Sequence, residues 1–343
     1  MPRSFRLMLT STGGGLAPQL IRLAQASLRH RIEVVAVDMR SDVLARYMAN
    51  AFATVPGGKD PAYIEAVKTI AVREGVNLII PGSDEEALAL SRAAPQLQEL
   101  GVQVAVASHD ILKVVSDKTL SYKALAAAGI KLPWWRRVES AEELRDAVIF
   151  GVAEYGSAVV KPVSDRGSRG VYVIKGEGGA ILDGGAREIH LTPTHFLEKI
   201  AAKYSYLPAL VMERLEEPVH DIDMLAWEGK PIRIIPRRRV SSALPNSGHV
   251  FLKSDELTSL GEAVARALKL TWLYDCDVMF NAKGQPQILE VNPRPSGSWA
   301  VSVVAGVPLL DDIVSLAKGE PVGAAENPAG RTVIPYQALH RIG

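Results

Sequence analysis

Short apolar runs and longer stretches with helical spacing alternate along the N-terminal third of the chain. Four apolar runs predict strands, at residues 5–10, 32–38, 77–81 and 102–106. Residues 16–29 have the apolar period of a helix. A second helix is expected to start with Asp60 as N-cap and Pro61 at its first position, and to end near Gly75. This alternation of strand and helix predicts a parallel, doubly wound sheet.

The pattern changes near residue 116. A helix is expected at residues 118–128, and Ser140 with Glu143 forms the capping box of another. Two strands, at residues 158–163 and 171–174, are joined by a loop rich in Gly, Ser and Arg. This segment therefore departs from the earlier βαβ pattern.

Hairpins dominate the rest of the chain, after a Gly-rich turn near residues 176–185. The strands expected there lie at residues 210–212, 222–227 and 231–235, followed by a helix at 257–268 and a hairpin over 277–292. We therefore expect three domains, which comprise residues 1–115, 116–185 and 186–343.

The last hairpin carries an unusual set of oxygen-bearing side chains. A two- or four-residue loop at its polar turn would place Asp277 opposite Glu290, with Asn292 on the same face as Glu290. Two like charges directly opposed destabilise a sheet unless a cation lies between them, and these side chains offer the hard oxygen ligands that Mg²⁺ prefers. Arg294 follows, with the fork geometry that suits a phosphate or a carboxylate. The alternative is an exposed hairpin with unrelated charges.

A lysine on a predicted strand indicates an anion nearby. Lys161 lies between apolar neighbours, where an unpaired ammonium would be costly to bury. The loop that follows, residues 164–170, is polar, and Gly167 and Gly170 free backbone N–H groups that can form an anion nest over phosphates. A mobile hairpin loop is the alternative for this segment, and the preceding lysine favours phosphate binding.

Three other motifs each allow a structural interpretation beside a functional one. Gly13, Gly14 and Gly15 follow a strand, and with Asp38 they could form an NAD site, although Pro18 replaces the third glycine of that fingerprint. A tight strand-to-helix turn that touches substrate is favoured instead. Residues 81–86 look acidic, but Ser83 with Glu86 reads as a capping box.

The third motif is a run of three arginines. Strand alternation puts Arg237 and Arg239 on one face and Arg238 on the other. The run is either a solvated face or a group that neutralises a phosphate or a substrate carboxylate.

Composition and charge narrow the class of protein. The net charge is +1, with 39 basic and 38 acidic residues among 343, so neither a nucleic acid nor a membrane is expected as a partner. The single cysteine, Cys276, cannot form an internal disulfide. Because the N-terminal apolar run is too short for a signal peptide, a soluble, cytoplasmic protein is expected.

Taken in order, these segments resemble the ATP-grasp superfamily, and they are most similar to its carbamoyl-phosphate-synthase-large-subunit-like and biotin-carboxylase-like branch. The resemblance is carried by SDKTLSYKALAAAGIKLP, VVKP, DRGSRGV, MERLEEPVHDID and DVMFNAKGQPQILEVNPR. It implies an ATP-grasp fold, α/β and α+β in class, preceded by a Rossmann-like parallel-sheet domain. The residues it assigns to ATP are Lys118, Lys161, Ser168, Arg169, Gly170, Glu213, Arg214, Leu215 and His220.

The resemblance also implies the metal and the substrate contacts. Asp277, Glu290 and Asn292 match the Mg²⁺ ligands, with Mn²⁺ as an alternative ion, and Arg294 joins Lys161 as a catalytic residue. Candidate substrate contacts are Arg237, Arg239, Ser296, Ser298, Gly13 and Gly14. The segment around Glu213 departs from the usual E-x-L-x-G-E, so the ribose contact is not assigned to one residue.

The implied activity is that of an ATP-dependent carboxylate–amine ligase, which forms an amide or peptide bond through an acyl phosphate and releases ADP and phosphate. Its partners would be a small carboxylate and a small amine, and a homodimer is a candidate assembly. One alternative is a carboxylase or carbamoyl-phosphate-synthase-like enzyme that acts through carboxyphosphate. The other, from a different class, is an NAD-dependent reductase that uses Gly13, Gly14, Gly15 and Asp38.

Overall fold

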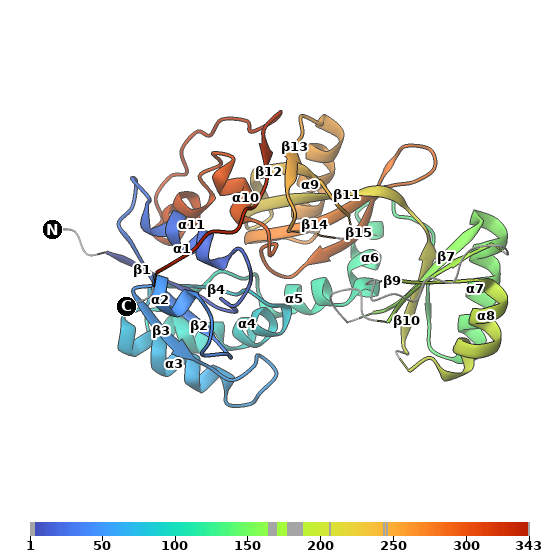
Figure 1. Ribbon diagram of the computed structural model, residues 1–343, viewed down its shortest axis with the longest axis horizontal. Coiled ribbons are helices and arrows are strands. Elements are labelled where there is room, and N and C mark those ends of the chain that lie inside the picture. Colours follow the sequence, from blue (N-terminus) through green and yellow to red (C-terminus); the bar gives the residue numbers. More distant parts are fainter. Residues whose placement is uncertain are drawn as a thin grey trace. The chain divides into compact units, whose positions relative to one another are not determined.

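The structure, a computed structural model, describes residues 4–163, 170–176, 188–205, 207–242, 244 and 246–341 (Figure 1). The chain forms two compact units, each assembled from separated segments. Unit 1 comprises Met1–Ser116, His220–Asp277 and Val291–Gly343, and unit 2 comprises Asp117–Val219 and Val278–Glu290. The division into residues 1–115, 116–185 and 186–343 stays a proposal.

Unit 1 opens with a five-stranded parallel sheet, in the order β3-β2-β1-β4-β5. Its strands are β1 (Phe5–Leu9), β2 (Ile32–Asp38), β3 (Ala51–Thr54), β4 (Leu78–Ile80) and β5 (Gln103–Val104). The helices between and after them are α1 (Ala17–Gln25), α2 (Ala45–Met48), α3 (Tyr63–Glu74), α4 (Asp84–Glu99) and α5 (His109–Ser116). The predicted parallel sheet is confirmed, although the short edge strand β3 was not predicted.

The start of α3 corrects the sequence prediction. The helix begins at Tyr63 after Ala62, so Asp60 is not its N-cap. Instead, the Asp60 carboxylate accepts a 2.8 Å bond from the Ala62 N–H in the turn that precedes the helix. Gly75 ends the helix as expected, with a left-handed φ of 62° that a glycine adopts without steric cost.

A six-stranded sheet follows in the order β15-β14-β11-β12-β13-β16. Its strands are β11 (Glu216–Trp227), β12 (Lys230–Arg239), β13 (His249–Phe251), β14 (Trp272–Phe280), β15 (Pro286–Asn292) and β16 (Thr332–Val333). The helices of this part are α9 (Asp255–Ala267), α10 (Ala300–Val304) and α11 (Leu309–Ala317). The long strands β11, β12 and β14 alternate apolar residues with the charged residues that form the site.

One hydrophobic core joins the two ends of the sequence within unit 1. Leu7, Ile21 and Val34 from the N-terminal sheet and α1 lie in the same cluster as Leu309 and Val314 from α11. The C-terminal helices therefore stabilise the first sheet, and Figure 1 shows α11 next to α1.

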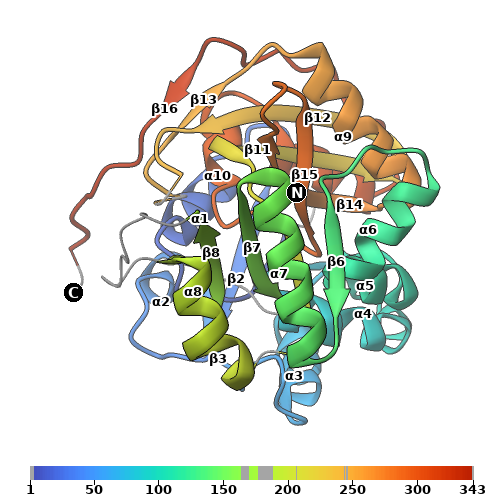
Figure 2. The same ribbon diagram turned by 90° about the vertical axis from the view of Figure 1, so that its right-hand side faces the viewer.

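Unit 2 is built around an antiparallel sheet in the order β6-β10-β7-β8-β9, in which only the β8–β9 pair is parallel. The strands are β6 (Trp135–Val138), β7 (Ser157–Pro162), β8 (Val171–Lys175), β9 (Glu188–Leu191) and β10 (Ala209–Glu213). Helix α7 (Ala141–Tyr155) packs on this sheet through Leu144 and Val148 (Figure 2). The Ser140 side chain caps it by accepting a bond from the Glu143 N–H, as predicted.

The turn between β14 and β15 differs from the prediction. The Asn281 N–H donates to the Gln285 carbonyl at 3.0 Å, and the Gly284 N–H donates to the Asn281 carbonyl at 2.9 Å. This pattern leaves three residues in the loop, with Gly284 in the left-handed conformation (φ 70°). A two- or four-residue loop was expected, so the turn does not support the argument that Asp277 faces Glu290.

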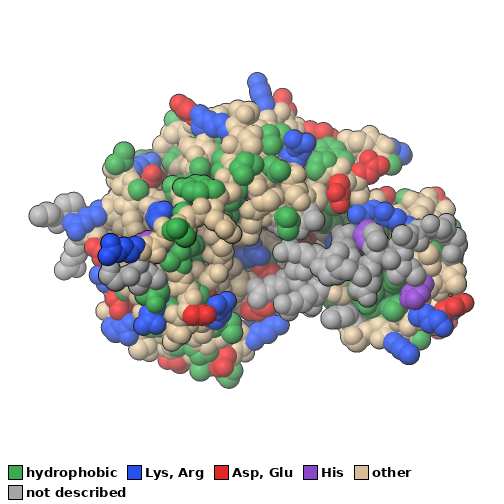
Figure 3. Space-filling view, viewed as in Figure 1, with side chains coloured by type: hydrophobic (Ala, Val, Ile, Leu, Met, Phe, Trp, Pro, Cys, Tyr) green, Lys and Arg blue, Asp and Glu red, His purple; other side chains and the backbone are tan. Residues whose placement is uncertain are grey.

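Among the described residues, no helix combines the length and the apolar character that a membrane span requires. On the face shown in Figure 3, the basic and acidic side chains of the described residues are interspersed, in keeping with the net charge of +1.

Candidate active site

Two lysines of unit 2 contact neighbouring residues of β15. Lys118 is the first residue of α6 (Lys118–Ala127), which Asp117 caps by accepting bonds from the N–H groups of Thr119 and Leu120. The Lys118 Nζ lies 3.2 Å from Glu290 Oε2, and both side chains are partly buried. The helix cap therefore places the first predicted ATP-binding lysine against a predicted metal ligand.

Lys161 lies on β7, where it is only 6 % exposed, and its Nζ donates a 3.2 Å bond to the carbonyl oxygen of Leu289. The Tyr122 hydroxyl, 2.9 Å away, donates to the same carbonyl. An anion was expected near Lys161, and among the contacts of its Nζ is this carbonyl, one residue before Glu290. The two lysines therefore contact consecutive residues of one strand.

The other ATP-binding residues predicted for unit 2 lie at the end of β10 and in the Gly-rich loop. Glu213 accepts a 3.0 Å bond from the Trp134 N–H, Arg214 lies 3.8 Å from Glu217, and Leu215 is buried. Gly170 has a left-handed φ of 68°, and its carbonyl accepts a 3.0 Å bond from the Tyr204 hydroxyl. Ser168 and Arg169, with the rest of the predicted lid over residues 164–169, lie outside the described residues.

A buried ionic network crosses the six-stranded sheet of unit 1. Arg237 has no solvent exposure, and its guanidinium makes a bidentate contact with Asp223, at 3.0 and 2.9 Å. Its Nη1 donates to the Ser298 hydroxyl at 2.8 Å. The predicted alternation is confirmed, because Arg238 is exposed. A fully buried, carboxylate-bound guanidinium has no surface left for a substrate, which argues against the predicted substrate contact of Arg237.

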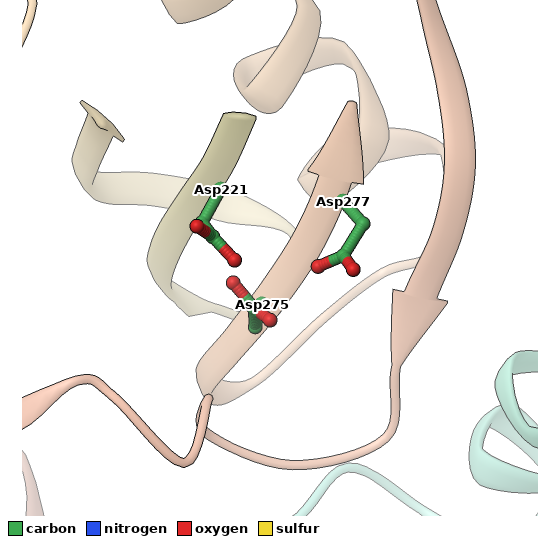
Figure 4. Close-up of side chains that lie close together, drawn as sticks. All are labelled: Asp221, Asp275 and Asp277. Carbon is green, nitrogen blue, oxygen red and sulfur yellow. The ribbon is translucent and has the colours of Figure 1, made fainter. Parts of the chain in front are cut away.

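Three aspartates of this network converge from β11 and β14 (Figure 4). One oxygen from each of Asp221, Asp275 and Asp277 lies within 4.8 Å of the others, and all three residues are buried. Burial acts to raise the pKa of Asp221, but Arg237, His249 and Arg239 hold that pKa well below its usual range. Burial, reinforced by Asp277 and Asp221, raises the pKa of Asp275 well above its usual value.

The charges of this network suit an added cation. In the described part of the chain, the guanidiniums of Arg237 and Arg239 contact the four carboxylates of Asp221, Asp223, Asp275 and Asp277. Burial lowers the pKa of His249, so that ring adds no compensating charge near neutral pH. A divalent cation would relieve the repulsion among these closely spaced carboxylates.

The donor atoms also fit such a cation. Asn292 donates its Nδ2 to Asp275 Oδ2 at 3.1 Å, and this contact does not use its carbonyl oxygen. Carboxylate and amide oxygens are the ligands that Mg²⁺ takes beside substrate phosphates. Asp277 and Asn292, both in unit 1, therefore carry donor atoms suited to the metal that the sequence predicted.

Arg294 is held by the N-terminal part of unit 1. Its Nε donates to Asp84 Oδ1 at 2.8 Å, and its Nη1 donates to the Pro295 carbonyl at 2.9 Å. Asp84 is the first residue of α4, where a helix N-terminus favours a negative charge. One edge of the guanidinium is thus fixed by a residue more than two hundred positions earlier in the chain.

The remaining predicted substrate residues have structural partners. Ser296 and Ser298 are buried and share a 2.8 Å bond between their hydroxyls. The Gly13 N–H donates to Asp38 Oδ2 at 2.6 Å, whereas Gly14 is exposed. A Cβ at position 13 would lie 3.1 Å from that carboxylate oxygen, which explains the glycine. Asp38 thus closes the strand-to-helix turn itself, in agreement with the tight-turn interpretation.

The acidic motif at residues 81–86 is only partly a capping box. The Ser83 side chain accepts from the Glu86 N–H, as predicted. The buried Glu86 carboxylate, however, accepts bonds from the hydroxyls of Thr10, Ser11 and Ser83, at 2.7, 2.6 and 2.9 Å. It therefore ties the loops after β1 and β4 together at the edge of the parallel sheet where such folds bind ligands.

Asp221, Asp223 and Asp275 were not predicted as members of the site. The available signal was the repetition of Asp at alternate positions in two apolar strands, at 221 and 223 and again at 275 and 277. Acidic residues on the buried face of a strand need cationic partners, and the alternating Arg237 and Arg239 supply them.

An open groove of about 510 Å³ lies elsewhere in unit 1, between α4 and the strand ends that carry Trp227 and Trp272. Its lining includes Ser91 and His109, whose side chains are 2.9 Å apart. None of the predicted site residues lines this groove, so it is separate from the residues described above.

The buried network gives a prediction about stability. We expect Asp223→Asn to lower the free energy of unfolding by about 3 kcal/mol, because Arg237 stays buried and charged after losing half of its bidentate partner. Urea unfolding followed by circular dichroism measures this change. Asp42→Asn is the control, because Asp42 is exposed and its replacement should leave stability close to that of the wild type. Equal effects in the two variants would contradict the role given to Asp223.

Two family models match this chain. The model described as "ATP-grasp in the biosynthetic pathway with Ter operon" matches residues 205–342, and the "PylC-like, N-terminal domain" model matches residues 7–105. A D-alanine–D-alanine ligase of Gloeobacter violaceus is 26 % identical over 205 residues, which are 55 % of this chain and 62 % of the relative. The matched part thus spans about three-fifths of that relative's length.

Solved structures share the fold. The biotin carboxylase domain of the Hydrogenobacter thermophilus 2-oxoglutarate carboxylase, solved with MgADP, ADP and bicarbonate, has a TM-score of 0.69 at 17 % identity, over 96 % of this chain and 73 % of that one. N5-carboxyaminoimidazole synthetase from Staphylococcus aureus, solved with ADP, has a TM-score of 0.68 at 14 % identity, over 95 % of this chain and 81 % of that one. At these identities the likeness concerns the fold alone.

Proposed function

Since this chain belongs to the ATP-grasp superfamily, we propose that it is an ATP-dependent ligase that joins a carboxylate to an amine. The observation that carries the proposal is the convergence of Lys118 and Lys161 on Glu290 and Leu289. Two ammonium groups beside a carboxylate are suited to a nucleotide whose phosphates carry a divalent cation. An NAD-dependent reductase has no support, because Asp38 is engaged in the turn at Gly13.

The proposed reaction needs positioning and charge neutralisation more than covalent chemistry by the protein. The substrate carboxylate attacks the γ-phosphate of ATP, which gives an acyl phosphate and ADP, and the amine then displaces phosphate. Lys118 and Lys161 would hold the phosphates, and Arg294 would face the transferred phosphoryl group or the substrate carboxylate. The Mg²⁺ ion that the family motif assigns to Asp277, Glu290 and Asn292 would neutralise charge on the phosphates when bound.

A carboxylase that acts through carboxyphosphate is the second candidate. The structures that share the fold include a biotin carboxylase domain and a carboxyaminoimidazole synthetase, but their identities of 17 % and 14 % say nothing of the reaction. The sequence relative that extends over 205 residues is a D-alanine–D-alanine ligase. That relationship supports the ligase as the first candidate.

A screen of phosphate release decides between these reactions. The purified protein is incubated with ATP, Mg²⁺ and pairs of amino acids or small carboxylates and amines. For a ligase, ADP and phosphate should form only when both an acid and an amine are present. Stimulation by bicarbonate without an organic acid would favour the carboxylase. Failure of every pair and of bicarbonate to stimulate ADP release would contradict both.

The Asp84–Arg294 contact allows a prediction for catalysis. We expect Asp84→Asn to lower kcat by about tenfold with little change in KM for ATP, since Arg294 keeps its charge but loses the ionic partner that orients it. Steady-state kinetics with the pair identified by the screen measures this. Asp60→Asn, in a loop of the same sheet domain, is the control. An unchanged kcat in Asp84→Asn would mean that the contact is only structural.

A further inference from the structure

One arginine of the buried network contacts a proposed metal ligand and a second carboxylate at the same time. The Arg239 Nη2 lies 2.6 Å from Asp221 Oδ1 and 2.8 Å from Asp277 Oδ2. Its Nε lies 3.0 Å from Asp221 Oδ2, so the guanidinium fork holds Asp221 through two nitrogens. The Arg239 side chain is only 11 % exposed. This arginine therefore links the two carboxylates inside the protein.

We propose that Arg239 is a positioning residue that fixes the carboxylate of Asp277 for cation binding. This inference rests on the function proposed above, and it replaces the earlier expectation that Arg239 contacts the substrate. The side chain would act through Asp277 and would not touch the reacting atoms.

The pairing of the strands holds Asp221, the second carboxylate that Arg239 contacts, in place. Arg239 pairs with His249, and Arg237 pairs with Asp221, so all four side chains lie on one face of adjacent strands. The His249 Nε2 is 3.1 Å from Asp221 Oδ2, and the Arg237 Nη1 is 3.7 Å from the same oxygen. Asp221 is thus held from several sides, which leaves the guanidinium of Arg239 little freedom to turn.

The sign of the charge on Arg239 shows what the contact can do. A guanidinium within hydrogen-bonding distance of Asp277 repels a cation bound to the same carboxylate, so it cannot serve to raise metal affinity. It can, however, hold Oδ2 in one direction and so fix the plane of the carboxylate. Residues that bond to metal ligands commonly orient them in this way. The benefit of Arg239 must then appear in turnover rather than in metal binding.

Three roles of Arg239 would give different results on its replacement. A substrate contact, when removed, raises KM for the substrate and leaves metal binding unchanged. If the residue has a purely structural role, its replacement lowers the melting temperature but leaves the turnover of the folded enzyme intact. A positioning residue lowers kcat, leaves KM for the substrate close to that of the wild type, and does not weaken metal binding.

The experiment compares Arg239→Gln and Arg239→Lys with the wild type by two readouts. Mn²⁺ is titrated into each protein in the presence of a non-hydrolysable ATP analogue, and the concentration of free Mn²⁺ is measured by electron paramagnetic resonance. Steady-state kinetics with the identified acid and amine give kcat and KM. Arg266→Gln is the control, because that arginine is exposed on α9 and pairs with the exposed Glu262.

We expect Arg239→Gln to lower kcat by about 10- to 100-fold, the range usual for residues behind a metal ligand, while Mn²⁺ binds as tightly as before or more tightly. Arg239→Lys keeps the charge but loses the planar fork, so its kcat should fall as well. A raised KM with unchanged kcat would overturn the proposal in favour of a substrate contact. Weaker Mn²⁺ binding in Arg239→Gln would also overturn it.

Two further variants keep the test decisive. Arg239→Gln leaves Asp221 with less compensation, so if this variant does not fold, Arg239→Gln combined with Asp221→Asn removes one charge of each sign and should fold. The same fall in kcat is expected there, and wild-type kcat would overturn the proposal. Asp277→Asn tests the metal assignment itself. If it binds Mn²⁺ as tightly as the wild type, the assigned metal ligands are wrong, a result distinct from failure of the positioning role.

Discussion

Asp277→Asn is expected to lower Mg²⁺-dependent turnover by roughly 1,000-fold while the protein stays folded. A bound metal contributes several kcal/mol to phosphoryl transfer, and each 1.36 kcal/mol corresponds to tenfold in rate. The fold should tolerate the change, because Arg239 still pairs with Asp221 and the amide oxygen of Asn can accept from Arg239. Steady-state turnover and thermal unfolding without metal measure the two parts of this prediction.

The stability part of this prediction differs for the other predicted carboxylate ligand. If Asp277 and Glu290 simply faced each other, removing either charge would hold or raise stability without metal. In the structure Glu290 pairs with Lys118 at 3.2 Å, so Glu290→Gln should lower the free energy of unfolding by up to about 1 kcal/mol. Asp255→Asn, at an exposed position, is the control for turnover. Full activity in Asp277→Asn would exclude this residue as a metal ligand.

The second large effect is expected for Lys161. Replacement by Met keeps the length and the apolar stem of the side chain but removes the ammonium, so ATP should bind about 10- to 100-fold more weakly. Within the protein, the loss of the bond from Nζ to the Leu289 carbonyl accounts for about 1 kcal/mol of stability. Calorimetric titration with a non-hydrolysable ATP analogue measures the affinity.

Lys175→Met serves as the matched control for Lys161. Lys175 lies in the neighbouring strand β8 of the same sheet, and its side chain is exposed. The control should bind the nucleotide as the wild type does. If Lys161→Met kept full affinity and unfolded instead, this lysine would be a structural residue rather than a nucleotide contact.

Local patterns in the sequence predicted those parts of the fold that depend on neighbouring residues. The alternation of strand and helix before residue 116 gave the parallel sheet, and Ser140 and Gly75 marked helix ends that the structure confirms. The predictions were wrong where a shift of one or two residues changes a helix start or the length of a hairpin loop. Asp60 stabilises a turn rather than capping α3, and a three-residue loop at residues 282–284 removes the register argument for Asp277 and Glu290.

The contents of the site were harder to predict because they depend on long-range pairing. Arg237 was expected at a substrate, yet its guanidinium lies against Asp223 on the neighbouring strand β11, and the alternating Asp and Arg residues did not show which of them pair. Arg294 was identified from its motif, but its partner Asp84 belongs to the N-terminal sheet domain. The sequence motifs thus indicated which charged residues belong to a site, whereas the fold was needed to show which of them form ion pairs.

Trapping of the acyl phosphate tests the proposed ligase most directly. The protein is incubated with ATP, Mg²⁺, hydroxylamine and the acid identified by the screen, without its amine. Hydroxylamine should then capture the activated acid as a hydroxamate, in an amount equal to the ADP released, and none should form without ATP. Formation of AMP and pyrophosphate in place of ADP and phosphate would contradict the acyl-phosphate mechanism.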